Sequence, residues 1–242
     1  MSKKISLKQY LMKTGKFEKV ADAVNAIKEN KVTLNGKIVA IPNYFFNPEK
    51  ILVRCGDEKI KKVSKLYFLM NKPAGLICQK SEDEKTIYDI LKSKVDESHV
   101  NSLFAVGRLD KDTEGLLIIT NDGKLAETIM HPAHEITKKY FAVLEKNLDK
   151  KDAIALEKGI IIELEDEPYK TRPAKIRIVK DKEVYVSITE GKKRQVKRMF
   201  ESIGNRVVQL KRVSIGGVSL GKLETGEIMQ ISKEELVQML EL

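Results

Sequence analysis

The sequence contains little cysteine and histidine. Its two cysteines, Cys55 and Cys78, have neither the CxxC nor the Cys/His spacing of a zinc site. His131 and His134 lie close together, but they and His99 form no helical HExxH pattern. We therefore expect two reduced thiols, histidines that are solvated or at the edge of the core, and no metal site.

Long apolar runs are also absent. No stretch approaches the roughly 20 apolar residues needed to cross a bilayer, and the first residues, MSKKISLKQYLMK, lack the apolar segment and cleavage site of a secretory signal. These absences predict a cytoplasmic protein without a membrane partner. The 242 residues, 42% hydrophobic and 33% charged, suit a folded globular protein.

Positive charge is plentiful. Lysine and arginine total 45 against 35 acidic residues, which gives a net charge of +10 and a pI near 9.3. Such an excess favours binding to a polyanion, although charge alone does not identify which one.

The first 56 residues have the pattern of two short helices and a hairpin. Apolar residues recur at helical spacing in two stripes, Leu7, Tyr10 and Leu11, then Val20, Ala23, Val24 and Ile27. The segment 32–39, VTLNGKIV, carries an Asn-Gly pair that favours a tight hairpin turn. Four lysines are left on the wet side of this module: Lys16, Lys19, Lys28 and Lys31.

This module resembles the S4 RNA-binding domain, through its xxLxxYL-type first helix, its basic second helix and the closing VTLNGKIV. The resemblance implies that the four lysines bind RNA, while a solvated charged face is the alternative. The sequence departs from the pattern at Glu18-Lys19, where such domains usually offer Ser-Arg. The polar segment 57–65 reads as a linker, so we expect domains at 1–60 and 61–242.

The second domain is predicted to be α+β with a mixed, largely antiparallel sheet flanked by helices. Four segments have strand character, 116–120, 140–144, 174–179 and 183–188, and 206–220 alternates like sheet. Ser232 and Glu235 form a capping box for a last helix, with Leu236, Met239 and Leu240 facing inward.

A polar loop between two glycines is the strongest chemical signal. Gly107 and Gly115 enclose Arg108 and three acids, Asp110, Asp112 and Glu114, directly before an apolar strand. A loop fixed at both ends can hold a carboxylate rigidly, and the neighbouring Arg108 favours its ionised form. The residues alone leave three interpretations open: a Mg²⁺ site, a carboxylate nucleophile or a plain charged loop.

A basic helix is the second signal. Val196, Met199, Phe200 and Ile203 recur at helical spacing, which leaves Lys197 and Arg198 off the apolar stripe. Lys192, Lys193 and Arg194 stand at its entrance. The cluster can clamp phosphates and keep Asp110 ionised, or it can be a solvated helix face.

The string GRLDKDTEGLLIITNDG, residues 107–123, resembles the signature of the pseudouridine synthases of the RsuA branch. The family's catalytic aspartate falls on Asp110. Segment 67–75, YFLMNKPAG, is similar to the strand and turn that open the catalytic domain. Lys138-Lys-Tyr140 resembles the motif whose tyrosine stacks on the target base, and 189–200 resembles the motif whose basic residue, here Lys197, pairs with the aspartate.

The resemblance implies isomerisation of a flipped-out uridine in ribosomal RNA, without an organic cofactor or metal. RNA contacts fall to Arg108, Lys138, Lys193, Arg194 and Arg198, and a monomer is expected. The runs QVKRMFESIGN and RVSIGG favour 16S rRNA, at the uridine numbered 516 in the enteric reference, with a 23S uridine as the alternative. Two rivals from other classes are a non-catalytic ribosome-assembly protein and a metal-dependent nuclease using Asp110, Asp112 and Glu114.

Overall fold

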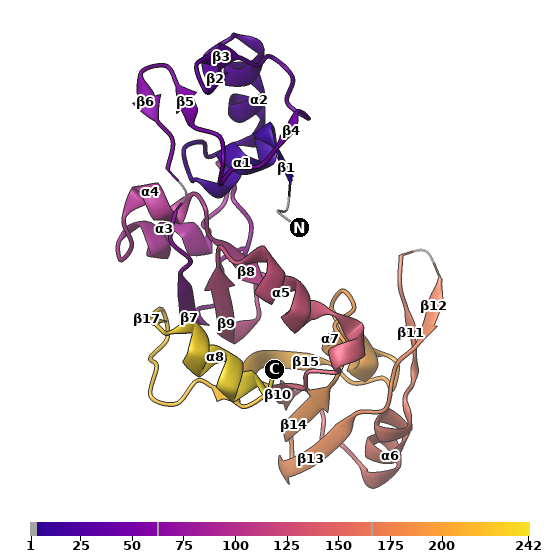
Figure 1. Ribbon diagram of the computed structural model, residues 1–242. Coiled ribbons are helices and arrows are strands. Elements are labelled where there is room, and N and C mark those ends of the chain that lie inside the picture. Colours follow the sequence, from indigo (N-terminus) through magenta and orange to yellow (C-terminus); the bar gives the residue numbers. More distant parts are fainter. Residues whose placement is uncertain (1–3, 62, 166) are drawn as a thin grey trace. The chain divides into compact units, whose positions relative to one another are not determined.

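The computed structural model describes residues 4–61, 63–165 and 167–242, and the chain divides into two compact units (Figure 1). Unit 1 comprises Met1–Lys65 and Leu91–Phe104, and unit 2 comprises Leu66–Ile90 and Ala105–Leu242. Among the described residues, no helix combines the length and apolar character required to cross a membrane.

Among its described residues, unit 1 contains three complete helices and a small antiparallel sheet of order β3-β2-β5-β6. Asn35 and Gly36 have φ of 48° and 80°, which confirms the predicted hairpin turn between β2 and β3. The elements are β1 (Ile5–Ser6), α1 (Leu7–Lys13), α2 (Val20–Lys28), β2 (Val32–Leu34), β3 (Lys37–Ile38), β4 (Phe45–Phe46), β5 (Val53–Cys55), β6 (Glu58–Lys59) and α4 (Glu97–Val100). Helix α3 (Ile87–Lys92) and strand β8 (Phe104–Val106) span the boundaries between the units.

The core of unit 1 contains most of the two predicted stripes. Leu7, Leu11 and Ile27 are fully buried. The prediction for Val20 is wrong, because its side chain is 55% exposed. In α2 the buried stripe is Ala23, Ala26 and Ile27, so the i, i+3, i+4 pattern begins one turn later than expected.

Unit 2 is built on a mixed sheet of order β13-β14-β10-β15-β9-β7-β17. Its β9–β15 pair is parallel and the remaining neighbours along this order are antiparallel, which confirms the predicted α+β class. The strands are β7 (Tyr67–Lys72), β9 (Glu114–Thr120), β10 (Lys138–Leu144), β13 (Lys175–Lys180), β14 (Glu183–Ile188), β15 (Val207–Ile215), β16 (Val218–Ser219) and β17 (Ile228–Gln230), with a separate hairpin of β11 (Ile161–Glu163) and β12 (Pro168–Lys170).

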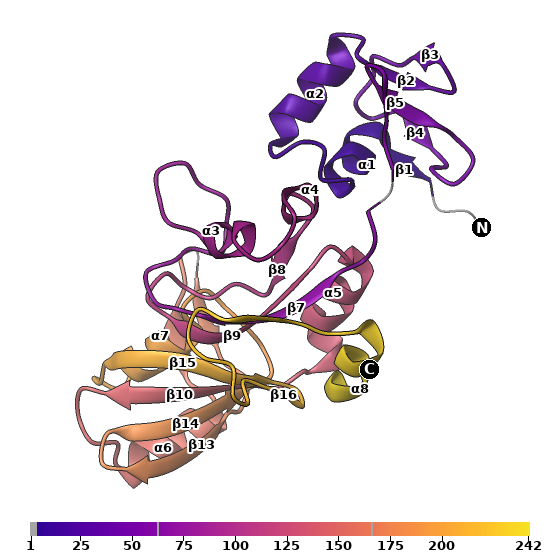
Figure 2. The same ribbon diagram turned by 90° about the vertical axis from the view of Figure 1, so that its left-hand side faces the viewer.

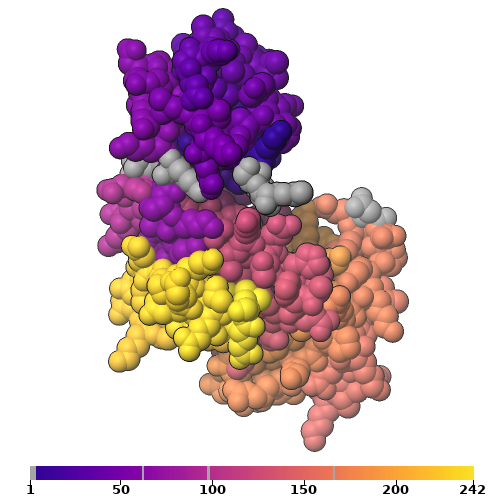
Figure 3. All heavy atoms as spheres, viewed as in Figure 1, coloured from indigo at the N-terminus to yellow at the C-terminus, as the bar shows by residue number. Residues whose placement is uncertain are grey.

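Two helices, α5 (Gly123–Met130) and α8 (Lys233–Leu240), share one core cluster with strands β7 and β9. Figure 3 shows the yellow atoms of α8 against the rose atoms of α5. Ser232 and Glu235 form the predicted capping box. Leu236 and Leu240 are buried as expected, but Met239 is 43% exposed, because it lies outside the helix face that Leu236, Val237 and Leu240 turn toward the cluster.

Helices α6 (Lys150–Lys158) and α7 (Gln195–Glu201) cover one face of β10, β13, β14 and β15. In Figure 2 both helices lie behind these strands, and no helix lies in front. The burial of β14 alternates accordingly: Val184 and Val186 are buried and Tyr185 between them is only half-buried. This half of the sheet therefore has one covered face and one open face.

Candidate functional site

The loop between Gly107 and Gly115 lies at the entrance of β9. Gly115 has φ of 105°, and a Cβ there would lie 2.2 Å from the backbone oxygen of Arg212 in the paired strand. Only glycine permits this close approach. The loop is fixed from outside by Gly75, whose N–H donates to Lys111 O at 2.7 Å, and by the thiol of Cys78, which contacts both the N–H and the carbonyl of Leu109 at 3.4 Å.

A buried ammonium holds the same loop from inside. Lys72, at the end of β7, is fully buried. Its Nζ donates to the carbonyls of Asp110 at 3.2 Å, Lys111 at 3.3 Å and Thr113 at 2.9 Å, and to that of Pro73 at 3.0 Å. Burial lowers the pKa of Lys72, and the negative charge of the loop acids Asp110, Asp112 and Glu114 opposes that shift. Because the contacts go to backbone, this lysine fixes the path of the loop and not one side chain.

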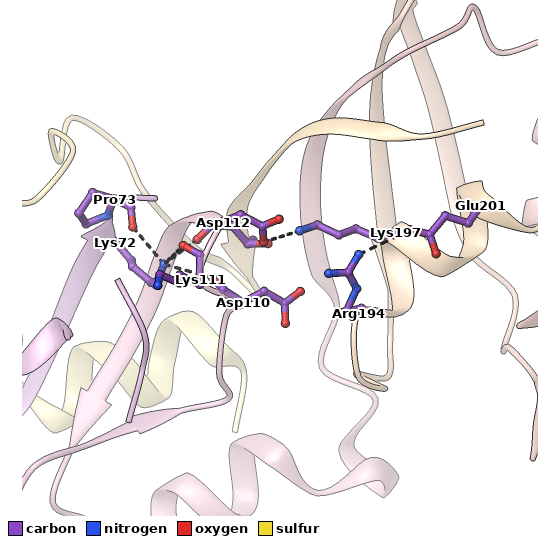
Figure 4. A network of polar contacts seen from close by, with 9 residues as sticks. Lys72, Pro73, Asp110, Lys111, Asp112, Arg194, Lys197 and Glu201 are labelled. Carbon is purple, nitrogen blue, oxygen red and sulfur yellow. Dashed lines mark hydrogen bonds and ion pairs between the residues drawn. The ribbon is translucent and has the colours of Figure 1, made fainter. Parts of the chain in front are cut away.

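The side chain of Asp110 is left available. Within the part of the chain that the structure describes, neither carboxylate oxygen of Asp110 accepts a hydrogen bond or joins an ion pair. Figure 4 shows the carboxylate extending from the loop toward the side on which Arg194 and Lys197 lie, away from the Lys72 ammonium. Its backbone is held while its oxygens stay uncommitted, which is the arrangement that a nucleophile requires.

The predicted partner of Asp110, Lys197, forms its ion pair with Asp112 instead. The Nζ to Oδ1 distance is 2.5 Å, and the two side chains are 7% and 66% exposed, respectively. Partial burial would raise the pKa of Asp112, but the hydrogen bond and charge of Lys197, with a further contribution from Arg194, lower it overall. Lys197 pairs with Asp112 because it lies in the first turn of α7, from which its side chain reaches the loop two residues beyond Asp110.

Replacing Asp112 with Asn should destabilise unit 2 by about 1–2 kcal/mol, because it leaves the buried Lys197 ammonium without its counter-ion. This lies below the roughly 3–5 kcal/mol typical of buried pairs, since the carboxylate is largely exposed and screened. Denaturant unfolding of both proteins measures the difference. Because the pKa of Asp112 is lowered in the folded protein, the penalty is full at neutral pH and shrinks as pH falls below the carboxyl's ordinary value of 3.8. A penalty that is independent of pH in that range would contradict the ion-pair explanation.

Tyr140 lies on the covered face of β10, in a row of paired residues that leads to the loop. Its neighbours across the strands are Val186 and Arg212, and Arg212 pairs in turn with Gly115, which pairs with Lys72. The Tyr140 side chain is 8% exposed. Paired residues share a face of the sheet, so the tyrosine and the loop are held on one side of it.

Arg212 is a further buried cation that the sequence did not reveal. It is 2% exposed, and its guanidinium donates to Leu116 O at 2.8 Å and to Gly107 O at 3.3 Å. It therefore binds β15 to both ends of the loop. The one available signal was its position two residues after Leu210, on the inward side of an alternating strand.

The other predicted RNA contacts in unit 2 differ in how exposed they are. Arg108 is exposed. Lys138 is half-buried and donates to Ile136 O at 3.1 Å. Burial lowers the pKa of Lys138, Arg212 lowers it further and Glu190 opposes the shift.

Three cations near α7 already have protein partners. Lys193 contacts Glu165, Arg198 contacts the carbonyl of Glu163, and Arg194 lies 3.6 Å from Glu201.

Arg194 also adopts a left-handed conformation at the start of α7, with φ of 53°. A non-glycine residue there is uncommon and costs free energy, so the surrounding structure must enforce it. Glu190 supplies part of that support, because its carboxylate accepts from Tyr169 Oη and from Gln195 Nε2, both at 2.6 Å.

The four lysines predicted to bind RNA in unit 1 are all exposed. Lys16 contacts Glu58, and Lys31 lies 2.7 Å from Glu29. Lys19 directly precedes α2 and Lys28 occupies its last turn. Exposed ion pairs of this kind are weak, so they leave the lysines able to exchange partners.

Among residues 4–61, 63–165 and 167–242, no group of three or more His, Cys, Asp or Glu side chains is arranged to hold a metal ion. Asp112 is committed to Lys197.

Known proteins share the sequence pattern and the fold of this chain. Residues 66–202 match the RNA pseudouridylate synthase family. The chain is 35% identical to ribosomal small subunit pseudouridine synthase A of Escherichia coli over 90% of this chain and 93% of that protein, and 39% identical to an RNA pseudouridine synthase of Aquifex aeolicus over 90% and 86%. A crystal structure of a pseudouridylate synthase superposes with a TM-score of 0.69 at 33% identity, covering 97% of this chain and 99% of that one. The chain therefore belongs to the RNA pseudouridylate synthase family.

Proposed function

We propose that this RNA pseudouridine synthase acts on a uridine of 16S ribosomal RNA and uses Asp110 as its nucleophile. The observation that carries the assignment is the contrast within one residue: the Asp110 backbone is held by the buried Lys72, while its carboxylate has no partner among the described residues. A positioned, uncommitted carboxylate is suited to attack at a sugar carbon.

The reaction is an isomerisation. The carboxylate either attacks C1′ of the uridine or removes a proton from C2′, and in both cases the bond between C1′ and N1 breaks. The uracil then rotates and C5 bonds to C1′, while the bond from C1′ to Asp110 breaks on the first route or the proton returns to C2′ on the second. A proton then leaves C5 and N1 gains one. Atoms and electrons balance without an oxidant or a co-substrate, and the target must leave its base stack for C1′ to be reached.

Tyr140 is proposed to stack on the flipped uracil. Its position in the row that ends at Gly115 and Lys72 supports this role. Lys197 is assigned an indirect role, because its ammonium neutralises Asp112 two residues from the nucleophile. Because Lys197 pairs with Asp112, the Asp110 carboxylate keeps its negative charge free for the reaction. Arg108 and Arg194 are proposed to contact the RNA phosphates.

The substrate assignment follows the relatives. Ribosomal small subunit pseudouridine synthase A of Escherichia coli and of Salmonella typhimurium are 35% and 34% identical to this chain over nine-tenths of its length. We infer that this enzyme shares their class of substrate, with uridine 516 of 16S rRNA as the target and a 23S uridine as the alternative. Unit 1 is proposed to act as an S4-like module that binds the same RNA through Lys16, Lys19, Lys28 and Lys31.

Mapping pseudouridine in ribosomal RNA from cells with and without the gene tests this proposal. We expect one modified 16S uridine to revert to uridine in the deletion strain, and to be restored by the purified protein acting on 16S transcripts or partly assembled small subunits. Loss of a 23S pseudouridine would move the target to the large subunit. An unchanged map, with the protein still bound to rRNA, would favour the non-catalytic assembly role.

A further inference from the structure

We propose that the open face of β10, β13, β14 and β15 is a second RNA-binding surface, which holds a single-stranded segment flanking the target and takes one of its bases into a pocket beside Asn71. The inference rests on RNA being the substrate, but it requires neither Asp110 chemistry nor a particular target uridine.

The surface is organised by strand register. Lys211 pairs with Phe141, Phe141 with Tyr185, and Tyr185 with Arg177. These four residues therefore form one row across four strands, on the face opposite to the row of Tyr140 and Arg212. Helices α6 and α7 leave this face uncovered (Figure 2).

Two aromatic rings form the centre of the row. The centroids of Phe141 and Tyr185 lie 5.4 Å apart with a tilt of 59°, and both side chains are half-buried. Aromatic rings presented from a sheet are a platform on which bases stack, and stacking tolerates any base because every base has a π-face.

Cations surround the rings. Lys139 Nζ lies 4.5 Å and Arg177 Cζ 4.8 Å from the centroid of Tyr185. The one acidic residue in these four strands, Glu183, is 3.4 Å from Lys180. Within the described part of the chain, Lys139, Arg177 and Lys211 have no acidic partner. Aromatic rings interleaved with such cations match a strand of alternating bases and phosphates, and this charge complementarity favours RNA over an apolar protein partner.

A pocket of about 440 Å³ opens at the edge of the aromatic pair, lined by Asn71, Phe141, Tyr185, Lys211 and Leu220. Its volume falls in the range of roughly 300–1,000 Å³ typical of small-molecule sites. Asn71 is 2% exposed. Its Nδ2 donates to Leu223 O at 2.8 Å, but its Oδ1 accepts no hydrogen bond among the described residues.

A buried amide oxygen without a donor is costly, and it marks a place where a ligand can supply one. The imino or amino N–H of a nucleobase is such a donor. The ring of the base would stack on Phe141 and Tyr185, and Lys211 would contact its phosphate. The pocket lies on the open face and not beside the Asp110 loop, so it suits a flanking base and not the reacting uridine.

The test uses the full-length protein and a single-stranded oligoribonucleotide taken from the sequence next to the target. Tyr185→Ala should weaken binding by about ten- to a hundredfold, because it removes a stacking platform. Tyr185→Phe keeps the ring and should bind like the wild type. Lys211→Gln should make the salt dependence of binding shallower by about one ion-pair step. Lys151→Gln, an exposed lysine on α6, is the matched control for loss of charge and should bind like the wild type.

The activity readout separates this inference from the proposed function. With the 16S RNA concentration varied up to saturation, Tyr185→Ala should raise KM and leave kcat unchanged. Lys211→Gln should do the same, and it provides the test if Tyr185→Ala folds poorly. Thiouridine-substituted RNA should crosslink to peptides of β10 or β14. The inference would be overturned if folded Tyr185→Ala and Lys211→Gln bound the RNA with wild-type affinity. It would also be overturned by a defect seen only with assembled subunits, because that would indicate a protein partner. Failure of the proposed function would appear instead as retained activity in the Asp110 variant.

Discussion

Asp110→Asn is expected to abolish pseudouridine formation, with the single-turnover rate falling by at least about 10⁴-fold, as for other removed nucleophiles. An amide neither attacks C1′ nor accepts the C2′ proton, so both routes to the intermediate are closed. Release of tritium from C5-labelled uridine in rRNA measures the rate directly, because the hydrogen at C5 is lost when C5 bonds to C1′.

The same variant should fold and bind RNA like the wild type. Lys72 contacts the carbonyl of Asp110 and not its side chain, so the substitution leaves the loop contacts intact, and we expect stability to change by no more than about 0.5 kcal/mol. Asp112→Asn, two residues away, is the comparison variant. It keeps the Asp110 carboxylate but deprives Lys197 of its counter-ion, so we expect activity to fall in part and not to be abolished. If Asp112→Asn abolished the reaction and Asp110→Asn did not, the two carboxylates would have to exchange roles.

The sequence predicted those parts of the fold that depend on neighbouring residues. The Asn35-Gly36 turn, the Ser232 capping box and strand β14 each depend on side chains within a few positions of one another. The loop between Gly107 and Gly115 was visible for the same reason, because glycines, acids and an apolar strand follow one another directly. The chemistry of the loop could not be predicted in the same way. Its acidic residues alone fitted a nucleophile, a metal site or a plain charged loop equally well.

The contacts that hold the loop could not be predicted. Lys72 and Arg212 read as ordinary cations in the sequence, and both are buried because they bind backbone carbonyls far along the chain. Lys72 reaches residues 38 to 41 positions away, and Arg212 reaches Leu116 and Gly107, 96 and 105 positions away. Backbone carbonyls carry no sequence signal, so only the fold identifies such partners.

Helical periodicity also could not predict whether Lys197 pairs with Asp110 or with Asp112. A helical pattern places Lys197 to within about one turn, roughly 5 Å along the axis. Asp110 and Asp112 are two residues apart in one loop, so an uncertainty of that size does not choose between them. The fold resolves the choice, because Asp112 turns toward α7 and Asp110 remains unpaired. The pairing is thus decided by loop conformation, which itself depends on Lys72.

Lys72→Met should therefore reduce activity strongly without touching a reacting group. Methionine fills a similar volume but removes the ammonium from the loop carbonyls. Gly75 N–H still donates to Lys111 O and Thr113 N–H to Asp110 O, so the loss falls on the carbonyls of Thr113 and Pro73, each at a cost of about 1–3 kcal/mol before relaxation. Removing the desolvated charge offsets part of this loss, so we expect a net destabilisation of about 2–4 kcal/mol. The relaxed loop would misplace the nucleophile, and a shift on the order of 1 Å can lower kcat by about a hundredfold.

Lys111→Met provides the matched control, because it changes the same residue type in the same loop. The Lys111 side chain is 57% exposed, and its one ion pair among the described residues is with Glu84 at the surface. Its loss should therefore change stability by less than about 1 kcal/mol and leave kcat unchanged. Thermal unfolding and single-turnover rates distinguish the two variants. Because Lys72 acts through backbone positions, kcat should fall while RNA affinity persists. Equal kcat in Lys72→Met and Lys111→Met would show that the nucleophile does not depend on the buried ammonium for its position.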